Sequence, residues 1–234
     1  MSAPRDQAPS VSIIIPVLNE AGEINELIAR LRESDPRSSA ELIAVDGDPA
    51  GGTVGVIADR GVLKVVSGRG RGRQMNLGAS LARGAVLLFL HADTRLPGNA
   101  LALIEAALGE RGIIGGAFDL GFDTNRRIFQ ITEKYVFLRT RLTRVPFGDQ
   151  AIFIRRDYFE KLGGYRDIPI MEDVELMKRI RKRGGRIRII REKVRTSPRR
   201  YEAEGLIRCT LRNWLMQFLY TMGASPERLA KWYR

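Results

Sequence analysis

The chain has 234 residues, of which 44% are hydrophobic, so it is long enough to bury a sizeable core as one domain. Its single cysteine excludes an internal disulfide, and with a single histidine it argues against a metal held by sulfur and nitrogen, leaving oxygen ligands. The net charge of +12 is uneven: residues 1–125 carry −3 (12 Lys and Arg against 15 Asp and Glu) and residues 126–234 carry +15 (27 against 12).

Strands and helices alternate over the first half of the chain. "VSIIIPVL" (11–18) is a continuous apolar run, typical of a strand buried on both faces of a parallel sheet. A helix with apolar residues at i, i+3, i+4 and i+7 follows over 19–33. Further strands are predicted at 41–48, 61–66 and 85–90, and further helices at 74–82 and 97–108. This order predicts an α/β fold with a mostly parallel sheet flanked by helices.

The pattern changes after this alternation. In "GGAFDLGF" (115–122) apolar residues alternate with others, which predicts an edge or antiparallel strand. Further strands are predicted at 150–156 and 186–190, with a helix at 172–184 between them. Apolar residues over 206–222 keep helical spacing and predict a strongly amphipathic helix. The short polar N-terminus does not resemble a signal peptide, and no apolar run is long enough to cross a membrane.

Polar residues follow three of the predicted strands, at 19–20, 46–48 and 91–93. Ligands of open parallel sheets bind beyond the carboxyl ends of the strands, so these residues are candidate site residues. His91 and Asp93 are two apart, and on an extended backbone both would face the same way. One carboxylate plus substrate phosphates is a usual way to hold Mg²⁺, which favours Asp93. An ordinary Asx-turn at 46–48 and a buried structural histidine are the simpler alternatives.

"GRGRGRQ" (68–74) is not a dinucleotide-binding fingerprint, because Arg73 stands where its third glycine belongs and the segment does not follow the first strand. An arginine-rich loop leading into a helix is compatible with closing over a diphosphate or with binding RNA. The basic second half likewise suits a polyanion, an anionic membrane or a phosphorylated substrate, or is a solubilising surface.

Glu172 and Asp173 open a predicted helix. Acidic residues in a first turn are stabilised by the helix dipole, and a carboxylate held rigidly there can equally serve as a general base. "SPRRY" (197–201) places Arg199 and Arg200 after the last strand, either as a surface turn or as clamps for a phosphate.

Six motifs, in this order along residues 10–205, resemble family 2 glycosyltransferases of the GT-A fold. They are "SIIIPVLNE", "VDGD", "GRGRQMNLGA", "FLHADT", "GDQAIFIRRD" and "EDVEL". They resemble the family's nucleotide loop, nucleoside-binding aspartates, basic Asn-x-Gly segment, metal-binding D-x-D, acceptor-side strand and catalytic Glu-Asp. The "HADT" motif with its companions resembles a compact bacterial subgroup. The predicted organisation is a disordered tail (1–9), a GT-A domain (10–205) with a nucleotide-sugar half (10–110) and an acceptor-side half (111–205), and a C-terminal amphipathic segment (206–234).

The resemblance implies transfer of a sugar, with inversion, from a UDP- or GDP-sugar to an unidentified acceptor hydroxyl. Asp93 would bind the Mg²⁺ or Mn²⁺ that bridges the diphosphate, and Asp173, beside Glu172, would take the acceptor's proton. The implied nucleotide-sugar site comprises Pro16, Asn19, Glu20, Asp46, Arg71, His91, Ala92, Asp93, Arg199 and Arg200. The implied acceptor side comprises Gly148, Asp149 and Gln150.

The first D-x-D position of the family is usually Asp, whereas this chain has His91. A neutral imidazole can ligate a metal or contact the ribose or the diphosphate, but it adds no negative charge. Both roles stay open for His91.

Two other functions remain open. A nucleotidyltransferase would share a nucleotide-binding sheet and a metal, but it would carry a Gly-rich loop after the first strand, where this chain has "PVLNEAGE". A basic RNA-binding module is the non-enzymatic alternative, whereas the resemblance implies no nucleic-acid partner. The expected location is the cytoplasm, with the C-terminal amphipathic helix contacting the inner face of an anionic membrane near a lipid-linked acceptor, forming a homodimer, or packing on the core.

Overall fold

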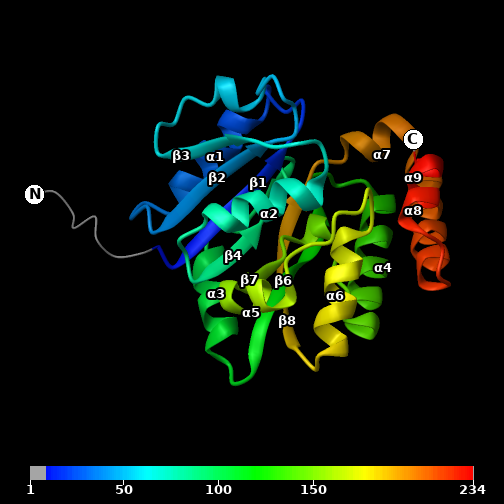
Figure 1. Cartoon of the computed structure of the whole chain (residues 1–234). Helices are drawn as coiled ribbons and strands as arrows, with labels where there is room; N and C mark the ends of the chain where they lie inside the picture. Colours follow the sequence, from blue (N-terminus) through cyan, green and yellow to red (C-terminus); the bar gives the residue numbers. More distant parts are fainter. Residues whose placement is uncertain (1–8, 234) are drawn as a thin grey trace, which may run out of the picture.

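The computed structural model of the chain describes residues 9–233, apart from the side chains of Arg200, Tyr201, Ala203, Leu206 and Ile207. The predicted N-terminal tail, except for Pro9, therefore lies outside the described residues. Figure 1 shows one sheet with helices on both faces and a group of C-terminal helices at one side.

Eight strands form the sheet in the order β3-β2-β1-β4-β7-β6-β8-β5. Their bounds are Val11–Val17 (β1), Ala40–Asp46 (β2), Val62–Val66 (β3), Val86–Phe89 (β4), Thr94–Arg95 (β5), Ile113–Phe122 (β6), Phe153–Arg155 (β7) and Arg186–Thr196 (β8). The strands from β3 to β4 pair in parallel, as do β6 and β8, whereas β7 is antiparallel to both its neighbours and β5 is antiparallel to β8. The predicted mostly parallel α/β sheet with an antiparallel portion is confirmed.

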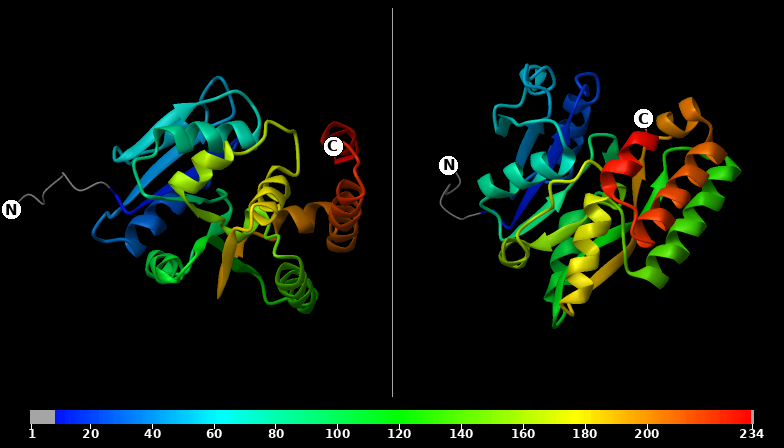
Figure 2. Two further views of the ribbon diagram at one scale, coloured as in Figure 1. Left: turned by 60° about the horizontal axis from the view of Figure 1, so that its bottom comes forward. Right: turned by 45° about the vertical axis from the view of Figure 1, so that its right-hand side comes forward.

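Helices cover both faces of this sheet. Their bounds are Ile24–Ser34 (α1), Arg71–Leu81 (α2), Ala100–Gly109 (α3), Arg127–Thr143 (α4), Arg156–Leu162 (α5), Glu172–Lys182 (α6), Arg199–Glu204 (α7), Leu206–Thr221 (α8) and Pro226–Tyr233 (α9), with 3₁₀ turns at Val54–Val56 (η1) and Gly148–Gln150 (η2). One apolar core lies between the sheet and α1, α3 and α4, and a second lies between the sheet and α2, α5 and α6. A third, small cluster joins α8 and α9 to the segment before α6 (Figure 2).

The strands β1 and β4 part where β4 ends. Their last paired residues are Ile14 and Phe89, and the next residue of β1 that faces β4 is Pro16. Proline has no N–H to donate, so it fits this unpaired position without the loss of a ladder hydrogen bond. The divergence leaves an opening at the carboxyl ends of the parallel strands, the place where ligands of such sheets bind.

Two predictions about the sheet are wrong in part. Residues 115–122 belong to β6, which is antiparallel to β7 as predicted but lies inside the sheet, between β7 and β8, and is buried almost throughout. β8 does not end at residue 190 but continues to Thr196, still paired with β6 beyond a register shift. Its end then meets β5, where Thr94 pairs with Thr196.

The predicted extended backbone at His91–Asp93 is also wrong. The amide of Thr94 donates to the carbonyl of His91 at 3.1 Å, so these residues form a turn. The helix predicted over 19–33 begins only at Ile24, after Asn19 has adopted a left-handed φ of 59°. The helices predicted at 172–184 and 206–222 are confirmed, as α6 and α8.

Four helices, α4, α5, α7 and α9, were not predicted from the sequence. In α4 the inward positions include the polar Thr132 and Thr140, while Ile131 and Leu138 are exposed. Because Phe129 and Val136 are also buried, the arrangement is mixed, which blurs the usual amphipathic pattern and hides the helix from a periodicity argument. Among the described residues, no helix is both long enough and apolar enough to cross a membrane.

Candidate functional site

Two connected hollows lie beyond the carboxyl ends of the parallel strands. The larger, here called the crevice, has a volume of about 910 Å³ and is lined by the ends of β1 and β4, the start of α2 and the start of α7. The smaller, here called the inner pocket, has a volume of about 160 Å³ and lies between η2, the start of α6 and the C-terminal helices. Four residues line both hollows and so mark their junction: Arg71, His91, Asp93 and Ser197.

Most of the residues predicted for the site lie in these two hollows. The crevice is lined by the predicted nucleotide-sugar residues Pro16, Asn19, Glu20, Arg71, His91, Ala92, Asp93 and Arg199. The inner pocket is lined by the predicted residues Gly148, Asp149 and Asp173. Asp46, Gln150 and Glu172 line neither hollow, and the side chain of Arg200 lies outside the described residues.

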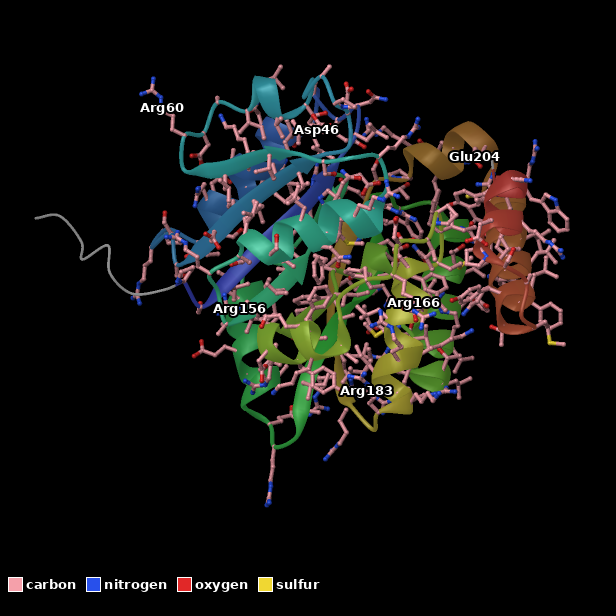
Figure 3. All side chains as sticks on the ribbon, viewed as in Figure 1. Asp46, Arg60, Arg156, Arg166, Arg183 and Glu204 are labelled. Atoms are coloured by element: carbon pink, nitrogen blue, oxygen red, sulfur yellow. The ribbon has the colours of Figure 1, made fainter. Side chains whose placement is uncertain are left out.

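Asp46, at the end of β2, is completely buried beneath the loop that follows it (Figure 3). Its Oδ2 accepts hydrogen bonds from the amides of Thr53 and Val54 at 2.8 and 3.1 Å, and its Oδ1 accepts one from the amide of Asp48 at 2.9 Å. A carboxylate that accepts several backbone hydrogen bonds fixes the local chain path. Asp46 therefore holds residues 47–54 in place, and it does not line the crevice.

Two amide side chains on α2, which were not predicted as site residues, tie this helix to its neighbours. Gln74 Nε2 donates to the carbonyls of Val17 and Val45 at 2.8 Å each, and so joins the ends of β1 and β2. Asn76 donates to the carbonyl of Tyr165 and accepts from its amide, both at 2.8 Å. Both residues belong to the "GRGRQMNLGA" motif, and their side-chain amides attach α2 to the backbone of neighbouring segments.

An ion pair joins the first residues of two helices at the junction. Nε of Arg71, which opens α2, lies 2.8 Å from Oε1 of Glu172, which opens α6. The Glu172 side chain is only 4% exposed, whereas that of Arg71 is 46% exposed. Burial raises the pKa of Glu172 and the neighbouring guanidinium opposes that rise. Glu172 therefore orients Arg71 and keeps its positive charge between the two hollows.

The next residue of α6, Asp173, faces the inner pocket. Its Oδ2 accepts a hydrogen bond from the amide of Gly148 at 2.7 Å, and its Oδ1 accepts one from the amide of Val174 at 2.7 Å. Met171, immediately before the helix, has a left-handed φ of 67°, a conformation that non-glycine residues adopt only where the surroundings enforce it. The carboxylate is thus held at a helix N-terminus in one position, as a catalytic base requires.

His91 packs directly against η2. A Cβ on Gly148 would lie 2.8 Å from His91 Nε2, so only glycine leaves room for the imidazole. Burial, and secondarily the charge of Arg71, lower the pKa of His91 to about 4, although Asp93 and Asp173 oppose the change. The imidazole is therefore neutral near pH 7 and can donate a hydrogen bond or offer a lone pair.

Acidic side chains gather along the rim of the crevice. Burial, and next the neighbouring Glu23, raise the pKa of Glu20 to about 7, and the charge of Asp93 adds to the rise. Arg199 forms an ion pair with Glu23. The rim therefore combines a carboxyl that is partly protonated near pH 7, beside Asp93, with arginines, including Arg69, that can meet phosphate.

No group of three or more His, Cys, Asp or Glu side chains that could hold a metal ion occurs in the described part of the chain. The donor set that remains is the Asp93 carboxylate with the neutral imidazole of His91 at the same junction. This set fits a divalent cation only if the ligand itself supplies further oxygens, as a diphosphate does.

Of the predicted acceptor-side residues, Asp149 lines the inner pocket and its neighbour Gln150 does not. Gln150 is completely buried, where its Oε1 accepts hydrogen bonds from Arg139 and Thr140 and its Nε2 donates to the carbonyl of Phe118 at 3.0 Å. Asp149 lines the inner pocket instead, and its Oδ1 is buried without a hydrogen-bond partner among the described residues. Burial raises the pKa of Asp149 to about 6.

The C-terminal helices supply part of the wall of the inner pocket. Cys209 and Asn213 of α8 and Tyr233 of α9 line it opposite the strand ends. None of them stands near a predicted motif, and only the folding back of the chain end brings them to the site. The amphipathic pattern of α8 was the one available signal, since it requires the helix to cover something.

Comparisons with known proteins bear on the family and the fold of the chain. The sequence model of the family described as "Glycosyl transferase family 2" matches residues 12–163. The chain is 31% identical over 185 residues to PGL/p-HBAD biosynthesis glycosyltransferases of Mycobacterium tuberculosis and Mycobacterium bovis. The matched part is 68% of this chain, and the chain spans 64% of the length of these relatives.

Two solved structures have a similar fold. The mannosyltransferase PcManGT from Pyrobaculum calidifontis, in complex with GDP-Man and Mn²⁺, matches with a TM-score of 0.60 at 23% identity, over 81% of this chain and 57% of that one. TarS of S. aureus, residues 1–349 in complex with UDP-GlcNAc, matches with a TM-score of 0.61 at 16% identity, over 80% and 58%. Both likenesses bear on the fold alone, and they confirm the predicted GT-A architecture.

Proposed function

Because the chain belongs to glycosyl transferase family 2, we propose that it transfers a sugar from a nucleoside-diphosphate sugar to an acceptor hydroxyl, with inversion at the anomeric carbon. The observation that carries this proposal is the junction of the two hollows. Arg71, His91 and Asp93 stand between the crevice, which is open and large, and the inner pocket, which contains Asp173. A donor on one side and an acceptor on the other meet at this point.

The crevice is the proposed donor site. Its volume of about 910 Å³ lies within the range of pockets that enclose ligands of this size. Pro16, at the end of β1, and Asn19 and Glu20, which follow it, would contact the nucleoside. The loop over 47–54 that Asp46 holds in place lies beside them, since the amide of Glu20 donates to Thr53 Oγ1 at 3.1 Å. GDP-Man in PcManGT and UDP-GlcNAc in TarS support a GDP- or UDP-sugar as the donor.

Positive charge at the junction serves the leaving group. As the bond from the anomeric carbon to the phosphate oxygen breaks, the nucleoside diphosphate takes the electron pair and gains negative charge. Arg71 is fixed there by Glu172, and Arg199 stands at the rim. These guanidinium groups would stabilise the departing diphosphate, together with the backbone at the start of α2.

Asp93 is the proposed ligand of a divalent cation, Mg²⁺ or Mn²⁺, with the diphosphate oxygens completing its shell. When bound, such an ion supplies Lewis-acid stabilisation of the diphosphate. The Mn²⁺ in PcManGT supports the proposal. The neutral His91 would either add a nitrogen ligand or donate a hydrogen bond to the diphosphate, and it would bring no charge that competes with the cation.

Asp173 is the proposed general base. It would accept the proton of the acceptor hydroxyl while the oxygen forms a bond to the anomeric carbon from the face opposite the phosphate. The amide of Gly148 holds the carboxylate in place. Asp149 lines the same pocket and would contact a second polar group of the acceptor.

The central test separates chemistry from binding at one residue. In Asp173→Asn the side-chain amide oxygen can still accept the hydrogen bond from the Gly148 amide, but the side chain cannot take up a proton. Nucleotide binding should therefore persist while transfer falls about 10²–10⁴-fold. The matched control is Asp157→Asn, because Asp157 occupies the same position in α5 but is exposed and pairs with Lys161. Substantial turnover by Asp173→Asn would remove Asp173 as the base.

The donor site is tested by thermal shift with GDP, UDP and their sugar conjugates, with and without Mn²⁺. The parent protein should be stabilised by at least one nucleotide, more so with Mn²⁺, and Asp93→Ala should lose the Mn²⁺-dependent part. A parent that no nucleotide stabilises contradicts the donor site. An undiminished Mn²⁺ effect in Asp93→Ala contradicts the metal ligand alone.

A further inference from the structure

Two helices, α4 and α8, expose apolar stripes. On α4 the stripe consists of Ile131, Leu138 and Leu142, at i, i+7 and i+11. On α8 and the residue that caps its C-terminus it consists of Leu211, Leu215, Phe218 and Met222, at i, i+4, i+7 and i+11. Each of these seven side chains is at least 50% exposed, and we call the seven together the α4–α8 face.

The two stripes adjoin. Arg126, just before α4, forms an ion pair with Glu202, shortly before α8, at 3.5 Å. Farther along, the rings of Tyr135 and Trp214 stack with their centroids 4.2 Å apart. Contacts near the starts and in the middle show that the helices run side by side in the same direction, as the right-hand view of Figure 2 also displays. Tyr135 and Trp214 form the seam between the stripes, so the face is continuous.

Positive charge borders the α4–α8 face. Arg127 and Lys134 form a row along α4 at seven-residue spacing, and Arg208 lies three residues before the α8 stripe. All three are exposed, and none has a carboxylate partner among the described residues. The nearby carboxylates are already neutralised, since Glu133 pairs with Lys193 and Glu202 with Arg126.

We propose that the α4–α8 face docks on an anionic lipid bilayer. Interfacial helices of this kind bury an apolar stripe at the acyl boundary while flanking basic side chains meet anionic headgroups. A second copy of the chain fits this charge pattern less well, because an isologous contact would bring both sets of unpaired cations into one interface. Anionic headgroups are complementary to the same cations.

The position of the face relative to the proposed active site gives docking a purpose. α8 presents the α4–α8 face on one side, while Cys209 and Asn213 on another side of the same helix line the inner pocket. A helix with its side chains is about 10–12 Å across, so the bilayer surface would lie about one helix diameter from that pocket. The hydroxyl-bearing part of a lipid-linked acceptor could then enter the inner pocket while its lipid part stays in the bilayer.

The test is flotation of the full chain with two kinds of vesicle, pure phosphatidylcholine and phosphatidylcholine containing phosphatidylglycerol, at low and at high salt. The parent should float with the anionic vesicles at low salt and release at high salt. Leu138→Glu/Phe218→Glu should lower the partition coefficient at least about tenfold. Arg127→Glu/Lys134→Glu should have an effect of similar size, about tenfold or more.

Matched controls change the same residue types elsewhere. Leu63→Glu/Leu81→Glu alters two exposed leucines on β3 and α2, and Arg37→Glu/Arg60→Glu reverses two exposed arginines. Figure 3 shows Arg60 on the side of the molecule opposite α8. Both control variants should float like the parent.

Two results would overturn the docking proposal: no binding to anionic vesicles at low salt, or equal loss in the control variants. If no vesicle binding is seen and Leu138→Glu/Phe218→Glu dissociates a dimer, the face is an interface between two copies of the chain instead. Thermal shift by nucleotide is measured on every variant, as evidence of folding and of the donor site. Because docking rests on flotation and the donor site on thermal shift, either proposal can fail while the other stands.

Discussion

The close approach of His91 to Gly148 makes Gly148→Ala a sharp test of the proposed active site. Gly148 has no positive φ, so alanine can adopt its backbone conformation without strain. The added Cβ, however, would lie 2.8 Å from His91 Nε2 and 3.1 Å from Cε1, and 3.6 Å from Asp173 Oδ2. The perturbation is therefore steric, and it acts on two residues at the proposed point of reaction.

The size of the effect follows from these distances. Restoring ordinary van der Waals contact requires the imidazole or η2 to move by roughly 0.6 Å. Overpacking of this kind costs about 1–3 kcal/mol of stability. For a chain of this length, Tm falls about 2–4 °C per kcal/mol, which gives a decrease of about 2–12 °C. A displacement of up to about 1 Å at reacting groups can reduce turnover by about 10²-fold, so kcat should fall about 10–100-fold.

The assay compares Tm and kcat of Gly148→Ala with those of Gly98→Ala. A Cβ on Gly98 would meet no heavy atom within 4 Å, so this control carries the same chemical change without the contact. Stabilisation by nucleotide should persist in both variants, because most of the crevice is distant from η2. If Gly148→Ala matches Gly98→Ala in both Tm and kcat, the packing of His91 against η2 does not position the site.

Three further predictions concern the groups that support the site. Asp46→Asn should destabilise the fold by about 1–3 kcal/mol in urea unfolding, because one of three backbone amides loses its acceptor, whereas Asp48→Asn on the same loop should be close to neutral. Asn76→Ala should cost about 1–3 kcal/mol by releasing the backbone of Tyr165, with Ser80→Ala on the same helix as the control. Asp149→Asn should change the pH dependence of stability: the pKa of Asp149 is raised to about 6 from 3.8, so in the parent its contribution falls as pH rises from about 4 to 6. The variant should thus be more stable than the parent above pH 6, with the difference vanishing towards pH 4; equal slopes in the two proteins would refute burial of an ionisable Asp149.

The sequence predicts the parallel part of the sheet well, because burial on both faces is a local property. A strand such as β1 needs an unbroken apolar run, and that run is visible in the sequence itself. The polar residues that follow β1 and β4 could be placed at one edge by the same rule, and the crevice lies there. α4 could not be found this way, because its exposed leucines and buried threonines blur the periodicity on which such a prediction rests.

The limits at the candidate site are of a different kind. Asp46 and Gln150 occupy positions that the motifs predict, but which atoms their oxygens meet depends on how a loop closes over them. Arg71 and Glu172 are about a hundred residues apart in the chain, and their pairing appears only when α2 and α6 point their first turns at one place. Asn213 and Tyr233 are farther still from any motif.

For α8, the sequence pattern and the folded contacts can be compared directly. Its amphipathic pattern predicts one buried side, and Met216 indeed packs there with Leu229 of α9 against Ile170. The other apolar side chains of α8 remain exposed to water. Exposed apolar surface of this extent is unfavourable in water unless another surface covers it. If a bilayer is that surface, it would cover the stripe without displacing the pocket wall, because Asn213 lies on a different side of the helix from Phe218. Leu138→Glu/Phe218→Glu should consequently keep both its nucleotide binding and its inner pocket, and lose only the attachment of that pocket to a membrane.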